Sequence, residues 1–310
     1  MSGGPPPDVA VIVPTRNRRK VLPQALGSVF AQTHRNFELI VVDDCSDDDT
    51  AAYLATISDP RFRWRRFDEW RRGSAARNHG VAMARAPILS FLDSDDRYLP
   101  DRLSSDLAFF AERPRADVRI SSFTSITSSG SSPCRNPEAI LGREEFERYL
   151  VGYCLHLGGS GIAIRRHAFE EVGGFDESLI RMQDRELLLR ISRSRGCGST
   201  SRINWVKTRS EDSLSHQPGG QINALAELCL RHPIIRERYP ELLRYLVARE
   251  IVSPLVKARF QQAREAFVEA RGNPDLGMSI GRLVPDYLVG KRHRRGIRQE
   301  ILGRFGIAMR

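Results

Sequence analysis

Three carboxylates lie within four positions of the segment SFLDSDDRYLP (90–100), directly behind an apolar run. Asp93, Asp95 and Asp96 would repel one another in any compact fold, so a cation is expected beside them. Mg²⁺ and Mn²⁺ bind one or two carboxylates and complete their coordination with water and phosphate oxygens. Zinc fits poorly, because no His or Cys lies at ligand spacing nearby. The cluster therefore predicts a site for Mn²⁺ or Mg²⁺ that in turn holds a diphosphate, while another carboxylate accepts a hydrogen bond from a ribose hydroxyl.

The first hundred residues alternate between strand-like and helix-like segments. Strands are predicted at VAVIVPTRN (9–17), NFELIVVDD (36–44), RFRWRRF (61–67) and PILSFLD (87–93). Helices are predicted between them at 20–32, 51–57 and 73–86. Such alternation indicates an α/β protein with a doubly wound, mostly parallel sheet.

Polar residues follow three of these four strands. They are Pro14-Thr15-Arg16-Asn17, Asp43-Asp44, and Asp93 with Asp95 and Asp96. A single acidic strand end is commonly a helix cap or a solvated turn. Ligands of open α/β sheets, however, bind outside the carboxyl ends of the strands. We therefore expect the three strand ends to converge on one crevice.

The rest of the chain continues the mixed pattern and then becomes helical. Helices are predicted at 101–113, 142–150 and 182–196, and a further helix in HAFEEVGGFDESL (167–179) is closed by Gly173-Gly174. A strand is predicted at 116–123, a serine-rich loop at 125–137, and a glycine-rich approach to a strand at 157–166. The sequence QPGG near 218 predicts a boundary, followed by a helical remainder (221–271) and a basic tail. No internal repeat is evident.

Composition indicates a globular protein and places it in the cytoplasm. Hydrophobic residues make up 41% of the chain and charged residues 28%. The longest apolar run, VAVIV (9–13), is the length of a strand, and MSGGPPPD at the N-terminus does not resemble a signal peptide. The five cysteines form no C-x-x-C pair, which favours a reducing compartment over a disulfide framework.

Positive charge is concentrated at the C-terminus. The net charge of the chain is +10, and residues 281–310 carry eight Lys and Arg against two acids. Such a tail could contact an anionic membrane, nucleic acid or an acidic partner, or could be a solvated arginine-rich helix. No nucleic-acid recognition motif accompanies it, so no nucleic-acid partner is expected.

Several segments together resemble the nucleotide-sugar-binding half of inverting family-2 glycosyltransferases with the GT-A fold. They are VAVIVPTRNR, SVFAQTHRNFELIVVDDCSDDDT, GSAARNHGVAMARA and ILSFLDSDD, with further matches at GIAIRRHAFEEVGGFDESL and MQDREL. An isolated D-x-D is a weak indication, but these segments occur in the right order and spacing. The resemblance implies a GT-A sheet with a nucleotide-sugar-binding half (8–100), an acceptor-binding and catalytic half (101–218) and a helical C-terminal region (219–310).

The resemblance also implies roles on the donor side. Pro14, Thr15 and Arg16 would line the nucleoside pocket, and Asp44 would hydrogen-bond the nucleobase edge. Uracil is the usual base in such enzymes, so a UDP-sugar is favoured. Arg72 or Arg77 would lie near the base or the diphosphate, and the motif does not decide which.

The acid cluster corresponds to the D-x-D motif of the family. Asp93, Asp95 and Asp96 would form it, with Asp95 favoured for the ribose and Asp96 for the metal, which Asp95 would share.

Arg72 and Arg77 also have a simpler interpretation, in which both are charged residues at the protein surface.

Inverting sugar transfer requires a base that removes a proton from the acceptor. The family places an acidic pair, commonly Glu-Asp, at the start of a helix after a G-G-F-D segment. Here GGFDESLIRMQD keeps the second acid as Asp184, while Gln183 replaces the first. Asp184 is therefore the expected catalytic base, although its position would equally suit a helix cap.

A second departure from the family pattern lies downstream. Many relatives carry Arg-x-His before Ser-Leu-Ser, whereas TRSEDSLSH has Arg209 followed by Glu211 in place of the histidine. His216 could take over a contact with diphosphate or metal, or be an ordinary surface residue. His156 falls where an acceptor wall is expected, with the same two interpretations.

Two other classes of function remain open. A sugar nucleotidyltransferase would need a glycine-rich loop after the first strand, and PTRNRRK contains no glycine. A non-catalytic carbohydrate- or nucleotide-binding module would be expected to lack the acids, all of which are present. The acceptor stays undetermined: a saccharide, a lipid-linked sugar, a natural product or a peptide. The basic tail could hold the enzyme at the inner face of a membrane.

Overall fold

The structure is a computed structural model, and it describes residues 5–128, 130–193, 196–208 and 219–304, without the side chains of 298 and 301–304. The chain forms two compact units. The sheet unit comprises Met1–Phe146, His156–Ser178 and Gln183–Ser210, and the helical unit comprises Glu147–Leu155, Leu179–Met182 and Glu211–Arg310. The three functional regions expected from the sequence stay a prediction, because compactness does not test function.

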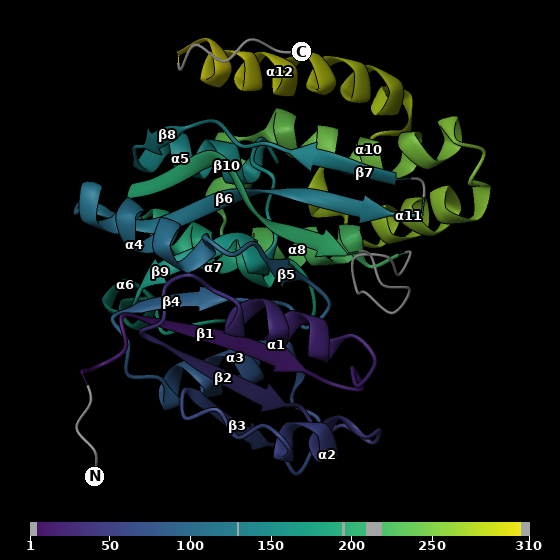
Figure 1. Ribbon diagram of the computed structural model, residues 1–310. Coiled ribbons are helices and arrows are strands. Elements are labelled where there is room, and N and C mark those ends of the chain that lie inside the picture. Colours follow the sequence, from purple (N-terminus) through teal and green to yellow (C-terminus); the bar gives the residue numbers. More distant parts are fainter. Residues whose placement is uncertain (1–4, 129, 194–195, 209–218, 305–310) are drawn as a thin grey trace. The chain divides into compact units, whose positions relative to one another are not determined.

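A mixed ten-stranded sheet organises the sheet unit, in the order β3-β2-β1-β4-β9-β6-β10-β5, with β7 paired to β6 and β8 to β10. The strands are β1 (Val9–Thr15), β2 (Phe37–Asp43), β3 (Phe62–Arg66), β4 (Ile88–Phe91), β5 (Arg97–Tyr98), β6 (Ala116–Thr127), β7 (Gly130–Cys134), β8 (Ala139–Leu141), β9 (Ile162–Arg165) and β10 (Gly196–Thr208). The four N-terminal strands are parallel, as predicted, and lie next to one another (Figure 1). Strand β9 runs antiparallel between β4 and β6.

Helices cover both faces of the parallel strands. The first seven are α1 (Leu22–Phe30), α2 (Thr50–Ala55), α3 (Arg72–Met83), α4 (Arg102–Glu112), α5 (Arg143–Val151), α6 (Arg166–Glu171) and α7 (Gln183–Ser192). Val11 of β1 belongs to the same buried core as Leu26 of α1. On the opposite face, Ile12 lies beneath Gly80 of α3, where an added Cβ would come within 2.5 Å of the Ile12 Cγ2 atom. Gly80 thus permits α3 to pack closely on the sheet, because β-strand side chains alternate between the faces.

The serine-rich loop predicted at 125–137 is wrong. Strand β6 continues to Thr127 and pairs antiparallel with β7, from Phe123 opposite Cys134 to Thr127 opposite Gly130. The serines misled the prediction, because polar side chains are tolerated on strands whose faces are exposed. Backbone pairing, rather than side-chain burial, holds the exposed end of this hairpin.

Strand β10 was missed altogether. The helix predicted at 182–196 ends at Ser192, and Gly196–Thr208 pairs in parallel with β6. The register shifts between Thr200 and Ile203 and again before Trp205, so the side-chain alternation that predicts a strand is broken. This strand ends at the same region as the acid cluster described below.

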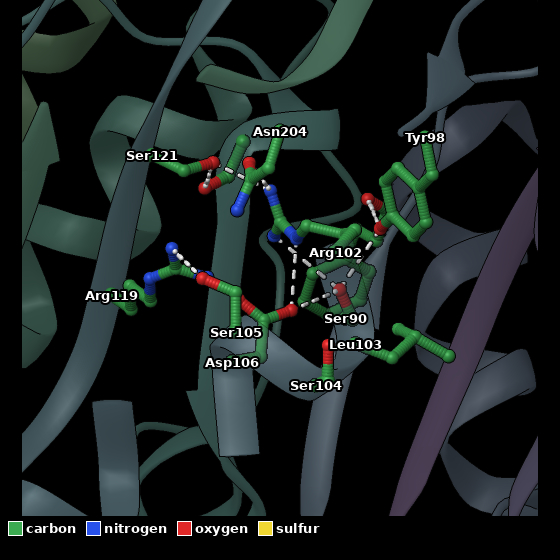
Figure 2. A network of polar contacts seen from close by, with 12 residues as sticks. Ser90, Tyr98, Arg102, Leu103, Ser104, Ser105, Asp106, Arg119, Ser121 and Asn204 are labelled. Carbon is green, nitrogen blue, oxygen red and sulfur yellow. Dashed lines mark hydrogen bonds and ion pairs between the residues drawn. The ribbon is translucent and has the colours of Figure 1, made fainter. Parts of the chain in front are cut away.

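A buried polar network lies inside the sheet unit. Arg102, Asp106 and Arg119 are almost completely inaccessible, and Figure 2 shows Asp106 between the two arginines. The Nε atom of Arg102 donates to Asp106 Oδ2 at 2.8 Å, and Arg119 pairs with the other carboxylate oxygen. Arg102 also donates to Ser121, whose hydroxyl donates to the carbonyl of Gly161 at 3.1 Å. The network therefore links α4 and β6 to the glycine turn at 158–161.

The helical unit contains α8 (Gln221–Arg231), α9 (Ile234–Arg238), α10 (Pro240–Val256), α11 (Phe260–Gly272) and α12 (Leu283–Arg304), with short 3₁₀ turns at Pro274–Leu276 and Ile280–Arg282. Helix α12 packs along α10 (Figure 1). Gly290 allows this contact, since an added Cβ would lie 2.2 Å from the Tyr245 Cβ. Within the described residues, every helix is too short or too polar to cross a bilayer.

Candidate active site

The carboxyl ends of three parallel strands meet as predicted. Thr15 at the end of β1 is in register with Asp43 at the end of β2. The backbone N–H of Asp44 donates to the Thr15 carbonyl at 2.8 Å. Strand β4 lies on the other side of β1, and Asp93 follows it by two residues. The parallel register thus brings the predicted nucleoside side and the predicted diphosphate side to one edge of the sheet.

Asp93 is paired with Arg77. The Arg77 guanidinium, from α3, donates to Asp93 Oδ1 at 2.7 Å. Burial works against the Asp93 charge, but Arg77 and then Lys207 outweigh it, so the pKa of Asp93 lies below its ordinary value. Asp93 is therefore ionised at neutral pH, and Arg77 is fixed by the acid cluster rather than free at the surface.

Asp96 is the most deeply buried acid of the cluster. Its Oδ2 accepts a hydrogen bond from the Ser160 hydroxyl at 2.6 Å, and its Oδ1 accepts one from the Thr208 backbone N–H at 3.0 Å. Burial, followed by the charge of Asp93, raises the pKa of Asp96 to about 8. Without a further cation, this carboxyl therefore holds a proton at neutral pH.

A glycine turn completes the wall of the cluster. Ser160 lies in the 3₁₀ turn Gly159–Gly161, and its hydroxyl also accepts a hydrogen bond from the Asp93 N–H at 3.0 Å. A Cβ at Gly159 would lie 3.1 Å from Asp93 Oδ1. A glycine-rich segment was predicted here from the sequence, but no role was predicted for Ser160. A polar residue between glycines was the only indication available.

Lys207 of β10 is the second residue that the sequence analysis missed. Burial disfavours its ammonium, but Asp96, Asp93, Asp95 and Asp184 together outweigh this effect, so the pKa of Lys207 is raised. Asp95, half-buried beside Asp96, also contributes to the raised pKa of Asp96. The ammonium of Lys207 thus interacts with four acids. From the sequence, a metal ion was the only cation expected beside the acid cluster.

Asp184 stands in the first turn of α7. Its Oδ1 is buried and has no hydrogen-bond partner among the described residues, so this oxygen does not cap the helix. Burial raises the pKa of Asp184; Arg77 opposes the effect, and Asp93 adds to it. The structure therefore places Asp184 within the electrostatic reach of the acid cluster, with an oxygen available to accept a proton.

The nucleoside side contains an exposed aromatic ring. Trp70 is 57% exposed, and the guanidiniums of Arg16 and Arg72 lie 4.7 and 5.5 Å from its ring centroid. Next to Trp70, the N–H of Arg71 donates to Asp44 Oδ1 at 2.7 Å, and burial raises the pKa of Asp44. The structure thus separates the two arginines that the sequence left undecided: Arg72 lies with the Asp44 group and Arg77 with the acid cluster.

Pro14 and Thr15 occupy the end of β1. Pro14 is half-buried, and the Thr15 hydroxyl is buried with no hydrogen-bond partner among the described residues. Asn17, two residues on, has a positive φ of 53° and donates its N–H to Ser46. These features position the loop after β1 against the loop after β2.

The histidine candidates find limited support. Arg209, Glu211 and His216 lie outside the described residues. The N–H of His156 donates to the Asn136 side chain at 2.7 Å, and its ring packs edge-on to Phe123. Its predicted place in an acceptor wall stays a prediction.

The donor set suits a hard divalent ion with few protein ligands. No group of three or more His, Cys, Asp and Glu side chains in the described part of the chain is arranged to hold a metal. Mg²⁺ and Mn²⁺ need only one or two carboxylates when phosphate and water supply the rest. Asp96 and Asp95, two neighbouring carboxyls at the carboxyl edge of the sheet, fit that requirement.

The sheet, its topology and the helices after it define a class of fold. The structure of Staphylococcus aureus TarS 1–349 in complex with UDP-GlcNAc is similar to 98% of this chain and 93% of its own, with a TM-score of 0.68 and 18% identity. The predicted GT-A fold is thereby confirmed. Residues 10–173, more than half of the chain, match the family model "Glycosyl transferase family 2", and the chain belongs to this family.

Curated relatives match part of the chain. The succinoglycan biosynthesis protein ExoO of Rhizobium meliloti (strain 1021) is 36% identical over 137 residues, which are 44% of this chain and 39% of ExoO. The putative teichuronic acid biosynthesis glycosyltransferase TuaG of Bacillus subtilis (strain 168) is 37% identical over 109 residues, 34% of this chain and 43% of TuaG. The matched part therefore spans less than half of either relative. Asp184 and Lys207 both lie beyond the family match, which ends at residue 173.

Proposed function

We propose that the chain transfers a sugar, with inversion, from a nucleotide-diphosphate donor to an acceptor hydroxyl, and that the donor is a UDP-sugar. One observation carries the proposal: Asp184 presents an unpartnered buried oxygen beside the acid cluster at the carboxyl edge of the sheet. Membership of family 2, whose members are inverting, supports the reaction. The UDP-GlcNAc complex of the similar TarS structure supports the choice of nucleotide.

The nucleoside would bind at the ends of β1 and β2. One oxygen of Asp44 accepts a hydrogen bond from the backbone N–H of Arg71, directly before α3, and a carboxylate with two oxygens can accept a base N–H with the other. Thr15 has an unpartnered hydroxyl nearby, and Arg16 and Arg72 supply positive charge. Asp95 would accept a hydrogen bond from the ribose.

The diphosphate would lie over the acid cluster. Asp96 and Asp95 would hold Mn²⁺ or Mg²⁺, and when bound this ion neutralises charge on the departing diphosphate. Arg77 keeps Asp93 in place and adds a fixed positive charge. The proton that Asp96 holds in the empty site would be released on occupation, because a cation favours the ionised form.

Asp184 would act as the general base. The acceptor oxygen attacks the anomeric carbon, the bond from that carbon to the diphosphate oxygen breaks, and the acceptor proton moves to Asp184 Oδ1. Burial keeps the pKa of Asp184 above its ordinary value, which makes the carboxylate a better base. Attack from the face opposite the diphosphate inverts the anomeric centre.

The helical unit offers support for contact with an anionic membrane, at which a lipid-linked acceptor would be held. Val284 and Leu288 are exposed on α12, and Lys291, Arg292 and Arg295 are exposed one to two turns further along. A helix with apolar and basic exposed residues is typical of interfacial helices. The protein would then act from the cytoplasm at the inner face of the membrane.

Calorimetric titration with UDP and with GDP, each in Mn²⁺ and in EDTA, tests the donor site. We expect UDP to bind in Mn²⁺, GDP to bind more weakly, and EDTA to weaken the binding of UDP. No binding of UDP, GDP or a wider panel of nucleotides in Mn²⁺ would overturn the proposed function. Co-sedimentation with phosphatidylglycerol vesicles at physiological salt tests membrane contact separately, with phosphatidylcholine vesicles as the control.

A further inference from the structure

The side chain of Lys207 lies against the glycine turn at 158–161. Lys207 and Trp205 are two residues apart on β10 and therefore lie on the same face of the strand, where both side chains reach Gly158. A Cβ at Gly158 would lie 2.9 Å from Trp205 Cη2 and 3.7 Å from Lys207 Nζ. At the next residue, a Cβ on Gly159 would lie 3.1 Å from Asp93 Oδ1. Two adjacent positions without side chains thus make room for an ammonium and a carboxylate side by side.

The backbone next to Lys207 is tied to the same cluster. The N–H of Thr208 donates to Asp96 Oδ1, and parallel pairing with Ser125 of β6 sets the register of Lys207. The end of β10 is therefore anchored at Asp96. The backbone of Lys207 therefore cannot move far from the acids without breaking that hydrogen bond or the strand pairing.

The two cations of the cluster, Arg77 and Lys207, differ in their hydrogen bonds to the acids. Arg77 donates to Asp93 at 2.7 Å. Lys207 interacts electrostatically with all four acids, yet the described residues give its ammonium no hydrogen bond and no ion pair within 4 Å. An ammonium has three donors and a flexible stem. Its donors are therefore available to an anionic ligand that enters the cluster.

We propose that Lys207 is a resident cation of the donor site, which competes with the divalent ion for the acids when the site is empty and binds the donor diphosphate when it is filled. This inference rests on the proposed function, since it assumes a diphosphate at the cluster. Two cations that share the same carboxylates weaken each other's binding, because each reduces the negative charge that attracts the other. The ammonium of Lys207 has the opposite effect on an anion such as a diphosphate: it attracts the anion and strengthens its binding.

Lys207→Met, which keeps the length of the stem and removes the charge, separates these effects. The full chain is titrated with MnCl₂ alone, and with UDP in EDTA. We expect the variant to bind Mn²⁺ more tightly and UDP in EDTA more weakly, each by roughly 5- to 150-fold, the usual range for coupled sites. Lys207→Arg retains the charge and should stay close to the wild type in both titrations.

Lys291→Met is the matched control, because it removes the same charge from the exposed face of α12 and should change neither affinity. Unchanged or weaker Mn²⁺ binding by Lys207→Met would overturn the proposal, and a fall in both affinities together would indicate a structural role. If the wild type fails to bind UDP even with Mn²⁺, the proposed UDP-sugar donor is wrong, and if GDP and a wider panel of nucleotides also fail, so is the proposed function. The Mn²⁺ titration without nucleotide still decides whether Lys207 competes with the ion.

Discussion

The hydroxyl of Ser160 joins two acids of the cluster: it donates to Asp96 Oδ2 at 2.6 Å and accepts from the backbone N–H of Asp93 at 3.0 Å. Both hydrogen bonds are buried or nearly so. The glycine turn that carries Ser160 is in turn held by Ser121, a member of the buried network in Figure 2. The geometry of the acids thus depends on a residue that carries no charge.

Ser160→Ala should therefore weaken both the fold and the donor site. The substitution leaves the Asp93 N–H and one oxygen of Asp96 without partners, which costs about 1–3 kcal/mol of unfolding free energy. UDP binding in Mn²⁺ should weaken as well, because the acids lose their alignment. Denaturant unfolding and calorimetry measure the two effects. Ser104→Ala, which removes a half-buried hydroxyl bonded to a backbone carbonyl, is the control and should change neither by much.

Asp184→Asn should slow transfer by orders of magnitude while leaving the binding of the donor intact. Loss of a general base lowers the rate by about 10²- to 10⁴-fold. The amide keeps the shape of the side chain, so the affinity for UDP in Mn²⁺ should hold. Release of UDP from the donor in the presence of an acceptor measures the rate, and calorimetry measures the affinity.

Asp96→Ala should show the opposite pattern, with weaker binding of UDP and loss of the effect of Mn²⁺. If the Asp184 and Asp96 variants reduced the affinity for UDP equally, the separation into base and metal ligand would be wrong. Comparing the two variants therefore tests whether Asp184 is the base and Asp96 the metal ligand, and not only whether each residue is important.

The stability of the metal-free protein should depend on pH through Asp96. Its pKa is about 8 in the folded protein and near 4 when unfolded, so the stability from holding the proton is present at low pH and is lost as the pH rises from about 4 to 8. Asp96→Asn cannot titrate. In EDTA, the variant should gain in unfolding free energy over the wild type between pH 5.5 and pH 8. Chemical unfolding at both pH values measures the difference, and an unchanged gap would contradict it.

The buried network should be essential for the fold. Asp106→Asn leaves Arg102 and Arg119 without their shared carboxylate, and breaking a buried pair costs about 3–5 kcal/mol. Asp101→Asn breaks a pair with Arg202 near the surface, and such pairs contribute about 0–1 kcal/mol. Urea unfolding of the two variants compares them directly. Similar losses in both would show that burial of the network matters little.

Trp70 should report on nucleotide binding. If the base lies at Asp44, it lies beside an exposed indole, whose fluorescence should change when UDP binds. Trp70→Phe should remove that change and retain binding, because the ring still packs between Arg16 and Arg72. Trp64→Phe, on β3, is the control and should keep the response. A response that survives in Trp70→Phe would place the base elsewhere.

Much of the parallel half of the sheet could be predicted from the sequence. The runs VAVIV (9–13) and LIVV (39–42) are apolar at every position, as strands buried on both faces require, and the helix between them is amphipathic. Once the strands are parallel, their polar ends must meet at one edge. The convergence of Thr15, Asp44 and Asp93 follows from that geometry.

Strand β10 could not be predicted from local sequence patterns. Its sequence, GCGSTSRINWVKT, has neither an apolar run nor a regular alternation. It is a strand because β6, about 80 residues earlier, pairs with it through three register shifts. Pairing between distant segments is not encoded in local propensity. For that reason Lys207, one of the two cations beside the acids, was not predicted from the sequence.

The sequence by itself determined the class of fold and the types of residue that gather at the strand ends, because local hydrophobic patterns and motif spacing specify both. Only the tertiary structure decided which side chains meet. Arg72 and Arg77 are five residues apart, yet a positive φ of 71° at Arg72 and the ion pair of Arg77 with Asp93 send them to different parts of the site. Charge pairing of this kind depends on distances in three dimensions, and those are set by the packing of the whole sheet unit.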